Sequence, residues 1–589
     1  MRSFLKLVFT SCLGSILAIF FLFIIILTIG LISSSGKNNI PKDAVLLLNF
    51  DGLLPERTNN VSQNNQFNFS PKNALGTYHI VELIKNAATD DRISQIVIKS
   101  ENSQMGFVSM RHLAEALDYC RENCDKPIYA YGDFFTQSGY ILASEADSVF
   151  LNPQGGIDLR GFGVMKSFNK ELLDKLGIKM NVFYAGDFKS AAEAYYRNDM
   201  SENSKTQTRA YLSSLHNSFV DLILENRNID KAVLSNGINE FKFSNADSTL
   251  SKGVVDGLMQ WFEFEDKLRD NLGLKKGKKI NYINLAEYDK KTKIKKKENK
   301  SKDKIAVVYA EGEIRYGEEI DGVINELTYH KIFDKIKSNE DIKAMVIRVN
   351  SPGGSSYTSE AILQEISDMQ ADGLPVIASF GNYAASGGYY IACQADTIVA
   401  EENTLTGSIG AFSVFPDVSN LMEEKLGIHF DTVKTGKFAA SFSPTLALQD
   451  QEKDIIRNSN TRIYNTFIGR VAEGRNMSIE EVEKIAQGRV WIGMKAKELN
   501  LVDEIGNLED AINIAAEKAG LETYSIREYP YIQTPPWVEF LEAFSQDNST
   551  SLGIQDNEIA KELLGLKSQL QFYTESKSPL VLMPFKILF

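Results

Sequence analysis

The sequence predicts an α/β protein made of two tandem copies of one unit, preceded by a single transmembrane helix. Three observations support this prediction. Strand-like apolar runs alternate with helix-like stretches, blocks of sequence recur at a nearly constant spacing, and a long uncharged segment lies near the N-terminus. The chain has 589 residues. Single cores seldom grow past roughly 250 to 300 residues, so two large units are expected.

The N-terminal segment has no charged residue from Leu7 to Gly36. A helix that crosses a bilayer needs about 20 apolar residues, which this run supplies. The alternative is a cleaved signal peptide, but such a peptide has an apolar region of about 7 to 15 residues and an A-x-A-like site, and neither fits. We therefore predict an uncleaved anchor over residues 1–40. The positive residues that flank it nearly balance, and no second convincing span follows, so we place the chain from about residue 40 outside the cytoplasm.

The composition is that of an ordinary globular protein, with 43% apolar and 24% charged residues. The net charge of −13 argues against a general nucleic-acid binder, because an acidic chain repels phosphates. The four cysteines and five histidines have no spacing typical of a disulfide framework or a metal site. We expect no metal and no cofactor.

An internal repeat organises the chain. Three blocks recur in the same order: DDRISQIVIK (from 90) with NEDIKAMVIR (from 339), GDFFTQSGYILASEAD (from 132) with GNYAASGGYYIACQAD (from 381), and GVVDGL (from 253) with NLVDEI (from 500). The first two pairs lie 249 residues apart and the third 247. A repeat of this kind indicates a gene duplication.

The domain boundaries follow from the repeat and from a lysine-rich stretch between its halves. KKTKIKKKENKSKDK, residues 290–304, is typical of a solvated linker, although a site for acidic lipids or nucleic acid is the alternative. Within each half, runs such as KIAVVYAEG and KAMVIRVN alternate with helical patterns, which predicts mostly parallel sheets. The predicted divisions are 1–40 anchor, 45–288 first repeat, 289–304 linker, 305–525 second repeat and 526–589 extension.

The C-terminal extension ends in PLVLMPFKILF. Eleven residues that include a lysine are too short to span a bilayer, which needs about 20 apolar residues. A packed strand or a contact between subunits is the more common use of such a tail.

A glycine-rich turn follows a predicted strand in the second repeat. VNSPGGS, residues 349–355, ends the strand-like run KAMVIRVN. Glycine adopts φ values that other residues avoid and leaves its backbone N–H unshielded, so this turn can donate hydrogen bonds to an oxyanion. The alternative is an ordinary turn between a strand and a helix.

A second small-residue block, GNYAASGGYY, contains Ser386. It follows the predicted strand LPVIASF and precedes a helix-like stretch, so Ser386 would lie near a helix N-terminus, where a developing negative charge is favoured. The neighbouring alanines leave room for a substrate chain. The alternative is a serine that only caps the helix. Two glycine-rich turns in one repeat favour a nucleophile.

These blocks carry a resemblance to a known family. VNSPGGS, N-x-AASGGYY and TLTGSIGAF (404–412) resemble the signature blocks of the signal peptide peptidase A, or protease IV, family in its long duplicated form. The anchor, the duplication and the order of the blocks extend the resemblance over nearly the whole chain. It implies a ClpP/crotonase-like fold for both repeats and a Ser/Lys dyad that cleaves remnants of signal peptides. It also implies a homo-oligomer, a tetramer, on the periplasmic side of the bacterial inner membrane.

The resemblance also implies where the base lies. A serine nucleophile needs an adjacent base, and none of the blocks contains a histidine. In the long form of the family, a lysine of the first repeat serves as the base. The matching residue in FYAGDFKSAAEAYYRNDMS is Lys189. Without the resemblance, the ordinary interpretation of Lys189 would be an exposed surface lysine. Alignment of the repeats sets Ala439 opposite Lys189 and Gln137 opposite Ser386. Each repeat lacks what the other has, which predicts one composite site.

Supporting roles are predicted for four further residues. Ser408, in TGSIG, matches the family position that holds the lysine amine; the alternative is an ordinary turn serine. We expect the backbone N–H groups of Gly354 and Gly387 to form the oxyanion hole, with Gly353 shaping the turn. Lys189 must be neutral to accept a proton, and burial lowers a lysine pKa.

Two other functions remain open at this stage. A crotonase-like acyl-thioester enzyme uses similar glycine turns, but it needs neither Ser386 nor Lys189, and a membrane anchor would be unusual for it. A catalytically inactive membrane scaffold has no reason to retain both dyad residues. The sequence therefore favours a serine endopeptidase that acts on peptide substrates.

Overall fold

The structure is a computed structural model that describes residues 40–51, 54–60, 74–292, 301–317 and 322–530, and the backbone of 580–582. All but the last residue of the predicted anchor, and most of the C-terminal extension, lie outside these residues. None of the helices in the described ranges is both long and apolar enough to cross a membrane.

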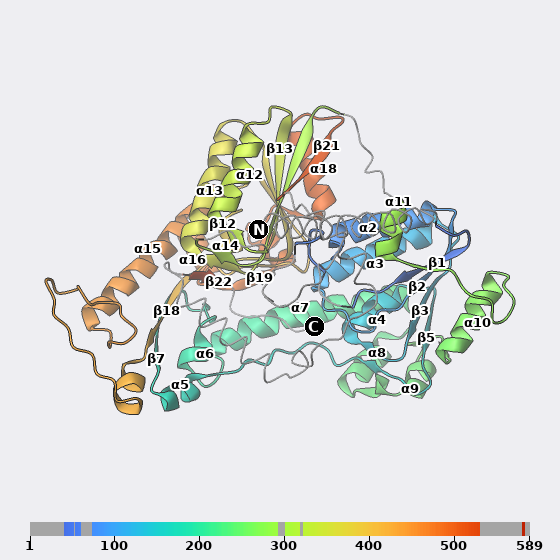
Figure 1. The fold of residues 1–589 in the computed structure, drawn as a ribbon, viewed down its shortest axis with the longest axis horizontal. Helices are drawn as coiled ribbons and strands as arrows, with labels where there is room; N and C mark the ends of the chain where they lie inside the picture. Colours follow the sequence, from blue (N-terminus) through green and yellow to red (C-terminus); the bar gives the residue numbers. More distant parts are fainter. Residues whose placement is uncertain are drawn as a thin grey trace, which may run out of the picture.

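Each repeat is built on a largely parallel sheet, and in Figure 1 the sheet of the second repeat lies at the top and that of the first on the right-hand side. The first has the order β8 (Gly257–Leu258), β5 (Ser148–Leu151), β3 (Ile128–Gly132), β2 (Ile93–Ile98), β1 (Ala44–Leu48), β9 (Tyr282–Asn284). In the second, the parallel strands with the same order are β20 (Glu504–Ile505), β16 (Thr397–Ala400), β15 (Val376–Ala385), β13 (Ile342–Ser351), β10 (Lys304–Glu311), β21 (Ser525–Tyr529). Strand β17 (Leu405–Gly407) also pairs with the end of β15, and β19 (Val490–Ile492) pairs antiparallel with β17. The prediction of two tandem α/β units is confirmed.

The spacing of the sequence blocks is also the spacing of the strands. Strands β2 and β13 begin 249 residues apart, at Ile93 and Ile342. Strands β8 and β20 begin 247 residues apart, at Gly257 and Glu504. Corresponding sequence blocks therefore form corresponding strands of the two sheets.

Helices cover both faces of each sheet. The first repeat has α2 (Thr77–Thr89), α3 (Phe107–Asn123), α4 (Gln137–Ser144), α5 (Lys170–Leu176), α6 (Glu193–Tyr196), α7 (Glu202–Asn226), α8 (Lys231–Asn239), α9 (Ala246–Ser251), α10 (Trp261–Asn271) and α11 (Leu285–Thr292). The second has α12 (Glu326–Lys337), α13 (Ser356–Ala371), α14 (Gly387–Tyr390), α15 (Asp450–Arg475), α16 (Ile479–Ile485), α17 (Gly493–Glu498) and α18 (Leu508–Lys518).

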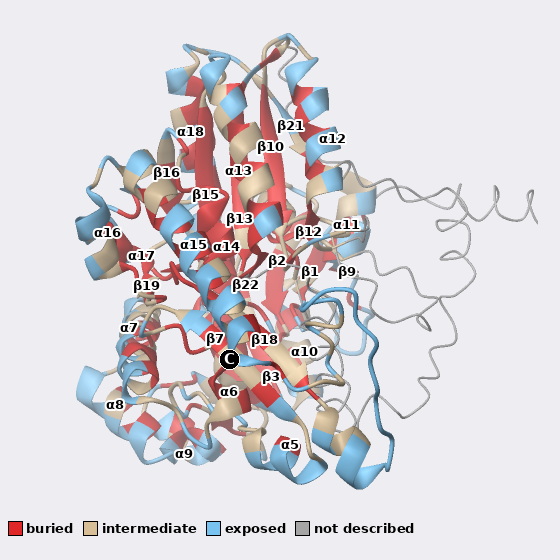
Figure 2. Ribbon diagram, turned by 90° about the vertical axis from the view of Figure 1, so that its left-hand side faces the viewer, coloured by how far each residue is buried: buried red, intermediate tan, exposed pale blue. Residues whose placement is uncertain are grey.

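Alternation along the strands explains the two layers of core. On β10, Ala306 and Val308 belong to the core beneath α12 and α13, while Ile305 and Val307 pack with α18 on the opposite face. Successive strand side chains point to opposite faces, so a strand buried on both sides is apolar throughout. Figure 2 shows β10, β13 and β15 as buried strands between helices with exposed outer faces.

The two repeats interlock through a third sheet. Its order is β12 (Ile324–Asn325), β11 (Ile314–Arg315), β14 (Gly353–Ser355), β22 (Leu580–Leu582), β18 (Ala411–Asp417), β7 (Lys179–Ala185). Strand β7 comes from the first repeat and pairs antiparallel along its whole length with β18 of the second. This pairing carries the segment after β7 into the second repeat.

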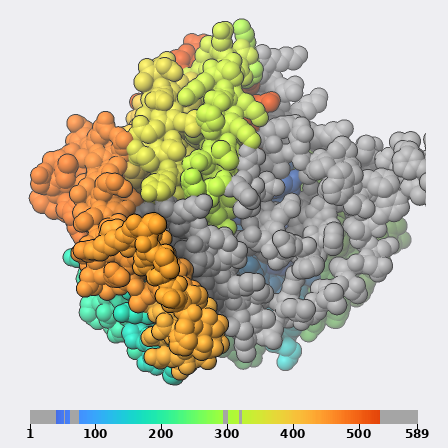
Figure 3. Space-filling model, turned by 60° about the vertical axis from the view of Figure 1, so that its left-hand side comes forward, coloured from blue at the N-terminus to red at the C-terminus, as the bar shows by residue number. Residues whose placement is uncertain are grey.

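An exposed excursion follows β18. Residues 423–439 are exposed throughout, and Figure 3 shows this part of the chain in light orange beside first-repeat residues in turquoise. The backbone N–H of Leu421 donates to the carbonyl of Gly177 at 2.9 Å. The excursion therefore adds a further contact between the repeats.

Candidate active site

Ser386 directly follows β15, at the point where the chain turns into α14. Its backbone has φ 57° and ψ −116°, a region that residues other than glycine rarely adopt, and its side chain is fully buried. It occupies the N-cap position of α14, but within the described chain its hydroxyl caps no backbone N–H. Helix α14 has only four residues, whereas the helix-like stretch SGGYYIACQAD that begins at Ser386 is longer. The strained turn, rather than a long helix dipole, is what presents Ser386.

Lys189 lies between β7 and α6 and reaches Ser386 from the other repeat. Its Nζ lies 2.7 Å from Ser386 Oγ, 2.8 Å from the Ser408 carbonyl oxygen and 3.0 Å from Ser408 Oγ. The side chain is 3% exposed, so it is not a surface lysine. The structure thus brings together three residues that the sequence singled out.

The charge state of Lys189 follows from its surroundings. Burial lowers the pKa of its amine well below the usual range for lysine. Among the described residues, Lys189 takes part in no ion pair that would favour the ammonium form. Burial without a counter-charge favours the neutral amine over the ammonium. The neutral amine is the form that can accept a proton.

The two glycine-rich turns meet next to Ser386. Gly353 and Gly354 have φ values of 99° and 155°, and a Cβ on Gly354 would lie 1.9 Å from the carbonyl oxygen of Ile314. A Cβ on Gly387 would lie 3.0 Å from the amide nitrogen of Gly354. Only glycine fits this close approach of backbones. Gly353 and Gly354 belong to the short strand β14, rather than to a plain turn.

The corresponding positions of the repeats cannot form second sites. Gln137 stands where the second repeat has Ser386, and its Oε1 accepts a hydrogen bond from the Gly161 N–H at 2.9 Å. Ala439 stands opposite Lys189 and is exposed in the excursion after β18. Of these positions, only Ser386 and Lys189 therefore meet, across the interface of the repeats.

The backbone of β22 lies in the slot between β14 and β18. It pairs antiparallel with β14, with Val581 opposite Gly354, and with β18, with Leu580 opposite Phe412. Two strand edges beside the glycine turn thus accept one extended segment between them.

Asn382 makes a contact between the repeats that the sequence did not reveal. Its Oδ1 accepts hydrogen bonds from the N–H groups of Val108 and Ser109, at 3.1 and 3.3 Å, and its Nδ2 donates to Ser109 Oγ at 2.8 Å. It therefore caps α3 of the other repeat, four residues before Ser386. Asn382 lies in the block N-x-AASGGYY, but nothing local to that block points to a helix so distant in sequence.

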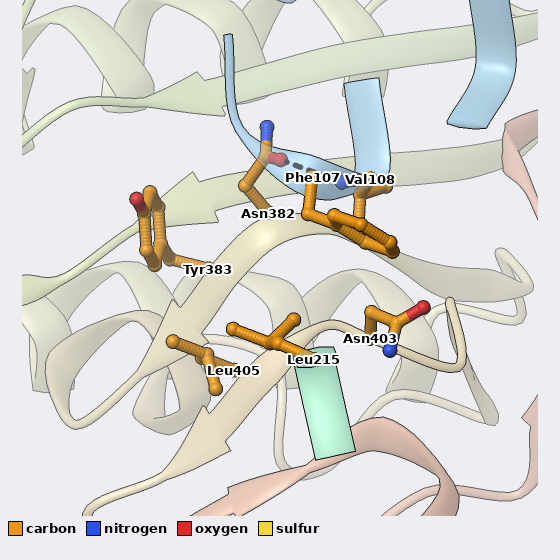
Figure 4. A pocket seen from close by; sticks show the side chains of 7 residues that line it. All are labelled: Phe107, Val108, Leu215, Asn382, Tyr383, Asn403 and Leu405. Carbon is orange, nitrogen blue, oxygen red and sulfur yellow. Dashed lines mark hydrogen bonds between the residues drawn. The ribbon is translucent and has the colours of Figure 1, made fainter. Parts of the chain in front are cut away.

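A small pocket lies between the repeats beside this contact (Figure 4). Its lining residues come from both repeats: Phe107, Val108, Leu215, Asn382, Tyr383, Asn403 and Leu405. The Ser386 and Lys189 side chains do not line it. In the described parts of the chain, no group of three or more histidine, cysteine, aspartate or glutamate residues could hold a metal ion.

Comparison with known proteins finds the same family signature in both repeats. The profile of peptidase family S49 matches residues 121–275 and 368–522, once in each repeat. Protease 4 of Haemophilus influenzae is 34% identical over 523 residues, which cover 85% of this chain and 84% of that protein. Protease 4 of Salmonella typhi is 33% identical, covering 87% and 85%. The putative signal peptide peptidase SppA of Enterococcus faecium is 37% identical over 195 residues, 33% of this chain and 56% of that protein.

The family signature therefore occurs in both halves of a chain whose similarity to its relatives extends over most of its length. The second repeat also has a buried serine at the end of a strand. The chain belongs to peptidase family S49 and is a serine protease.

Proposed function

We propose that the protein is a membrane-anchored serine endopeptidase in which Lys189 is the general base and general acid for the nucleophile Ser386. The observation that carries this proposal is the 2.7 Å separation of Lys189 Nζ and Ser386 Oγ, both of them buried. A nucleophile and its base must lie within about 2.6 to 3.2 Å of each other.

The hydrogen bonds of Lys189 suit a neutral amine. A neutral amine has two N–H donors and one lone pair. The two oxygens of Ser408, at 2.8 and 3.0 Å, take the two donors. The lone pair is then left for the Ser386 hydroxyl proton. Ser408 accordingly orients the base.

The reaction proceeds in two stages. Ser386 Oγ attacks the peptide carbonyl as its proton moves to Lys189 Nζ, and the N–H groups of Gly354 and Gly387 donate to the resulting oxyanion. The Lys189 ammonium then protonates the leaving amine, which leaves an acyl-enzyme. A water molecule that gives a proton to Lys189 attacks the acyl-enzyme, and the proton returns to Ser386 Oγ as the product acid departs.

We further propose that the substrates are cleaved signal peptides and similar apolar peptides. The slot between β14 and β18, which accepts the extended backbone of β22, supports a substrate bound as a strand. The relative named signal peptide peptidase supports the same class.

The remaining parts of the proposal concern location and assembly. Residues 1–40 serve as a single-pass anchor in the bacterial inner membrane, with the catalytic part on the periplasmic side. Both repeats have a ClpP/crotonase-like fold, and four copies assemble into a homotetramer. The uncharged run from Leu7 to Gly36 and the resemblance of the motifs support these statements.

Labelling with a fluorophosphonate probe, which reacts with activated serines, tests the dyad. We expect the wild-type protein to be labelled and the variants Ser386→Ala and Lys189→Ala not to be labelled. Normal labelling of the lysine variant would exclude Lys189 as the base. Absence of labelling in the wild type would favour an inactive scaffold, while thioesterase activity that survives Ser386→Ala would favour an acyl-thioester enzyme.

A further inference from the structure

A buried glutamine connects the base to the other half of the site. Gln207 lies on α7 of the first repeat and its side chain is 1% exposed. Its Nε2 donates to the Phe188 carbonyl oxygen and to Ser190 Oγ, each at 3.1 Å. These two acceptors belong to the residues on either side of Lys189. The amide thus holds the backbone from which the base projects.

The oxygen of the same amide binds the second repeat. Gln207 Oε1 accepts a hydrogen bond from the N–H of Val490 at 3.2 Å. Val490 begins β19 (Val490–Ile492), which pairs antiparallel with β17 (Leu405–Gly407) and sets Val490 opposite Gly407. The Gly407 carbonyl accepts the N–H of Ser386 at 2.7 Å. One side chain therefore links the segment of the base to the strand pair that fixes the nucleophile.

The same strand pair also fixes the residue that orients the amine. The N–H of Ser408, directly after β17, donates to the Arg489 carbonyl at 2.7 Å. Gly488 packs so closely on Lys189 that a Cβ there would lie 2.7 Å from the Lys189 backbone nitrogen. Residues 488–490 therefore contact Lys189 on one side and Gly407 and Ser408 on the other.

The duplication shows the same asymmetry at this position as at the dyad. Helices α7 and α15 begin at Glu202 and Asp450, and alignment of these starts places Ile455 opposite Gln207. Ile455 is 46% exposed. The repeat that has no lysine base thus has no buried amide here either.

From these contacts we infer that Gln207 is a positioning residue, which holds Lys189 in line with Ser386 and Ser408 across the interface of the repeats. The inference rests on the proposed Ser386/Lys189 mechanism. A lysine side chain has many rotamers. The position of its amine therefore depends on how firmly the backbone at Lys189 is held. Displacement of a reacting group by about 1 Å can lower the rate about 100-fold.

The chemistry of the amide makes the inference specific. A glutamine both donates and accepts, as these contacts require. Methionine keeps the volume but has no donor, and an ionised glutamate has no donor and adds a charge. Charged groups on the surrounding elements that reach the same segment are Lys166, whose Nζ donates to the Ser190 carbonyl at 2.8 Å, the buried Glu193 on α6, and Arg489, which lies over the Phe188 ring.

The test compares Gln207→Met and Gln207→Glu with a matched control in the full-length protein. Gln95 on β2 is 2% exposed and binds the Leu268 carbonyl at 3.2 Å, so Gln95→Met removes a buried amide away from the dyad. The readouts are the rate of fluorophosphonate labelling, kcat and KM on a fluorogenic peptide, and the pH dependence of kcat/KM. Thermal melting verifies that each variant is folded.

We expect Gln207→Met to lower the labelling rate and kcat by about 10- to 100-fold, with KM changed little. We expect Gln207→Glu to move the acid limb of kcat/KM to higher pH, because an added anion favours the Lys189 ammonium. Gln95→Met should leave all readouts at wild-type values. A folded Gln207→Met with wild-type kcat, or a Gln207→Glu with an unmoved acid limb, would overturn the inference. An unlabelled wild type would instead overturn the proposed function.

Discussion

The amine of Lys189 and the hydroxyl of Ser386 lie 2.7 Å apart, although 197 residues separate them in the chain. They come from different copies of a duplicated unit, and the strand pair β7 and β18 is what carries one into reach of the other. Gln137 and Ala439 stand at the corresponding positions of the other copies, so this contact exists only across the interface of the two repeats.

The first prediction concerns the dyad on a peptide substrate. Ser386→Ala and Lys189→Met should each lower kcat/KM by on the order of 1,000-fold or more, since each change removes one of the two reacting groups of the proposed dyad. The double variant should lose no more than the worse single variant, because the two residues act as a unit. Ser144→Ala is a matched control: Ser144 is equally buried, on α4, and binds the Ile141 carbonyl. Additive losses in the double variant would contradict a shared role.

The second prediction concerns pH and stability. Burial lowers the pKa of Lys189 in the folded protein, whereas the unfolded chain has an ordinary lysine value. Between these two pKa values the unfolded state binds more protons, so the contribution of Lys189 to the free energy of unfolding rises with pH. Lys189→Met should therefore raise Tm at neutral pH, and its advantage should shrink as the pH approaches about 10.5. A constant difference in Tm across that range would show that the folded-state pKa is not lowered.

The third prediction concerns the glycine turn. Gly354→Ala should lower kcat by about 100- to 1,000-fold, because the new Cβ would meet the Ile314 carbonyl and displace the proposed oxyanion donor. Gly373 is a useful control. It also has a positive φ, of 90°, but a Cβ there would meet no atom within 4 Å. Gly373→Ala should lower Tm without lowering kcat; equal losses of kcat in both variants would point to backbone strain alone.

The fourth prediction concerns the C-terminal strand. If substrates use the slot between β14 and β18, then β22 competes with them for the same backbone groups. Deletion of residues 580–589 should therefore lower KM for a peptide by several-fold, and the added peptide PLVLMPFKILF should inhibit the shortened protein competitively. An unchanged KM, or inhibition that is not competitive, would show that substrates bind elsewhere.

The sequence predicted local features better than contacts between the repeats. Apolar runs such as that of β10 predicted the parallel sheets. The glycine turns could be predicted because they lie at positions where only glycine fits. Lys189, by contrast, has no local signal and was predicted only from the family resemblance. The crossing of β7 and the amide of Gln207 could not be predicted, because a contact between distant segments leaves no periodic pattern in either. The helix-like stretch that begins at Ser386 forms only the four residues of α14 and then continues as turns, a difference that its composition does not reveal.

The last prediction separates the two halves of the composite site. We expect no peptidase activity from residues 40–288 or from residues 305–589 when each is produced as a separate chain. The first chain contains Lys189 but not Ser386, and the second contains Ser386 but not Lys189. When the two chains are produced together, the pairing of β7 with β18 and the capping of α3 by Asn382 should bring them together and restore labelling by the fluorophosphonate probe. Asn382→Leu should weaken this restoration more than it weakens activity of the intact chain, since the covalent link keeps the local concentration of the halves high. Labelling of the second chain alone would show that Ser386 finds its base within its own repeat, and the composite site would then be wrong.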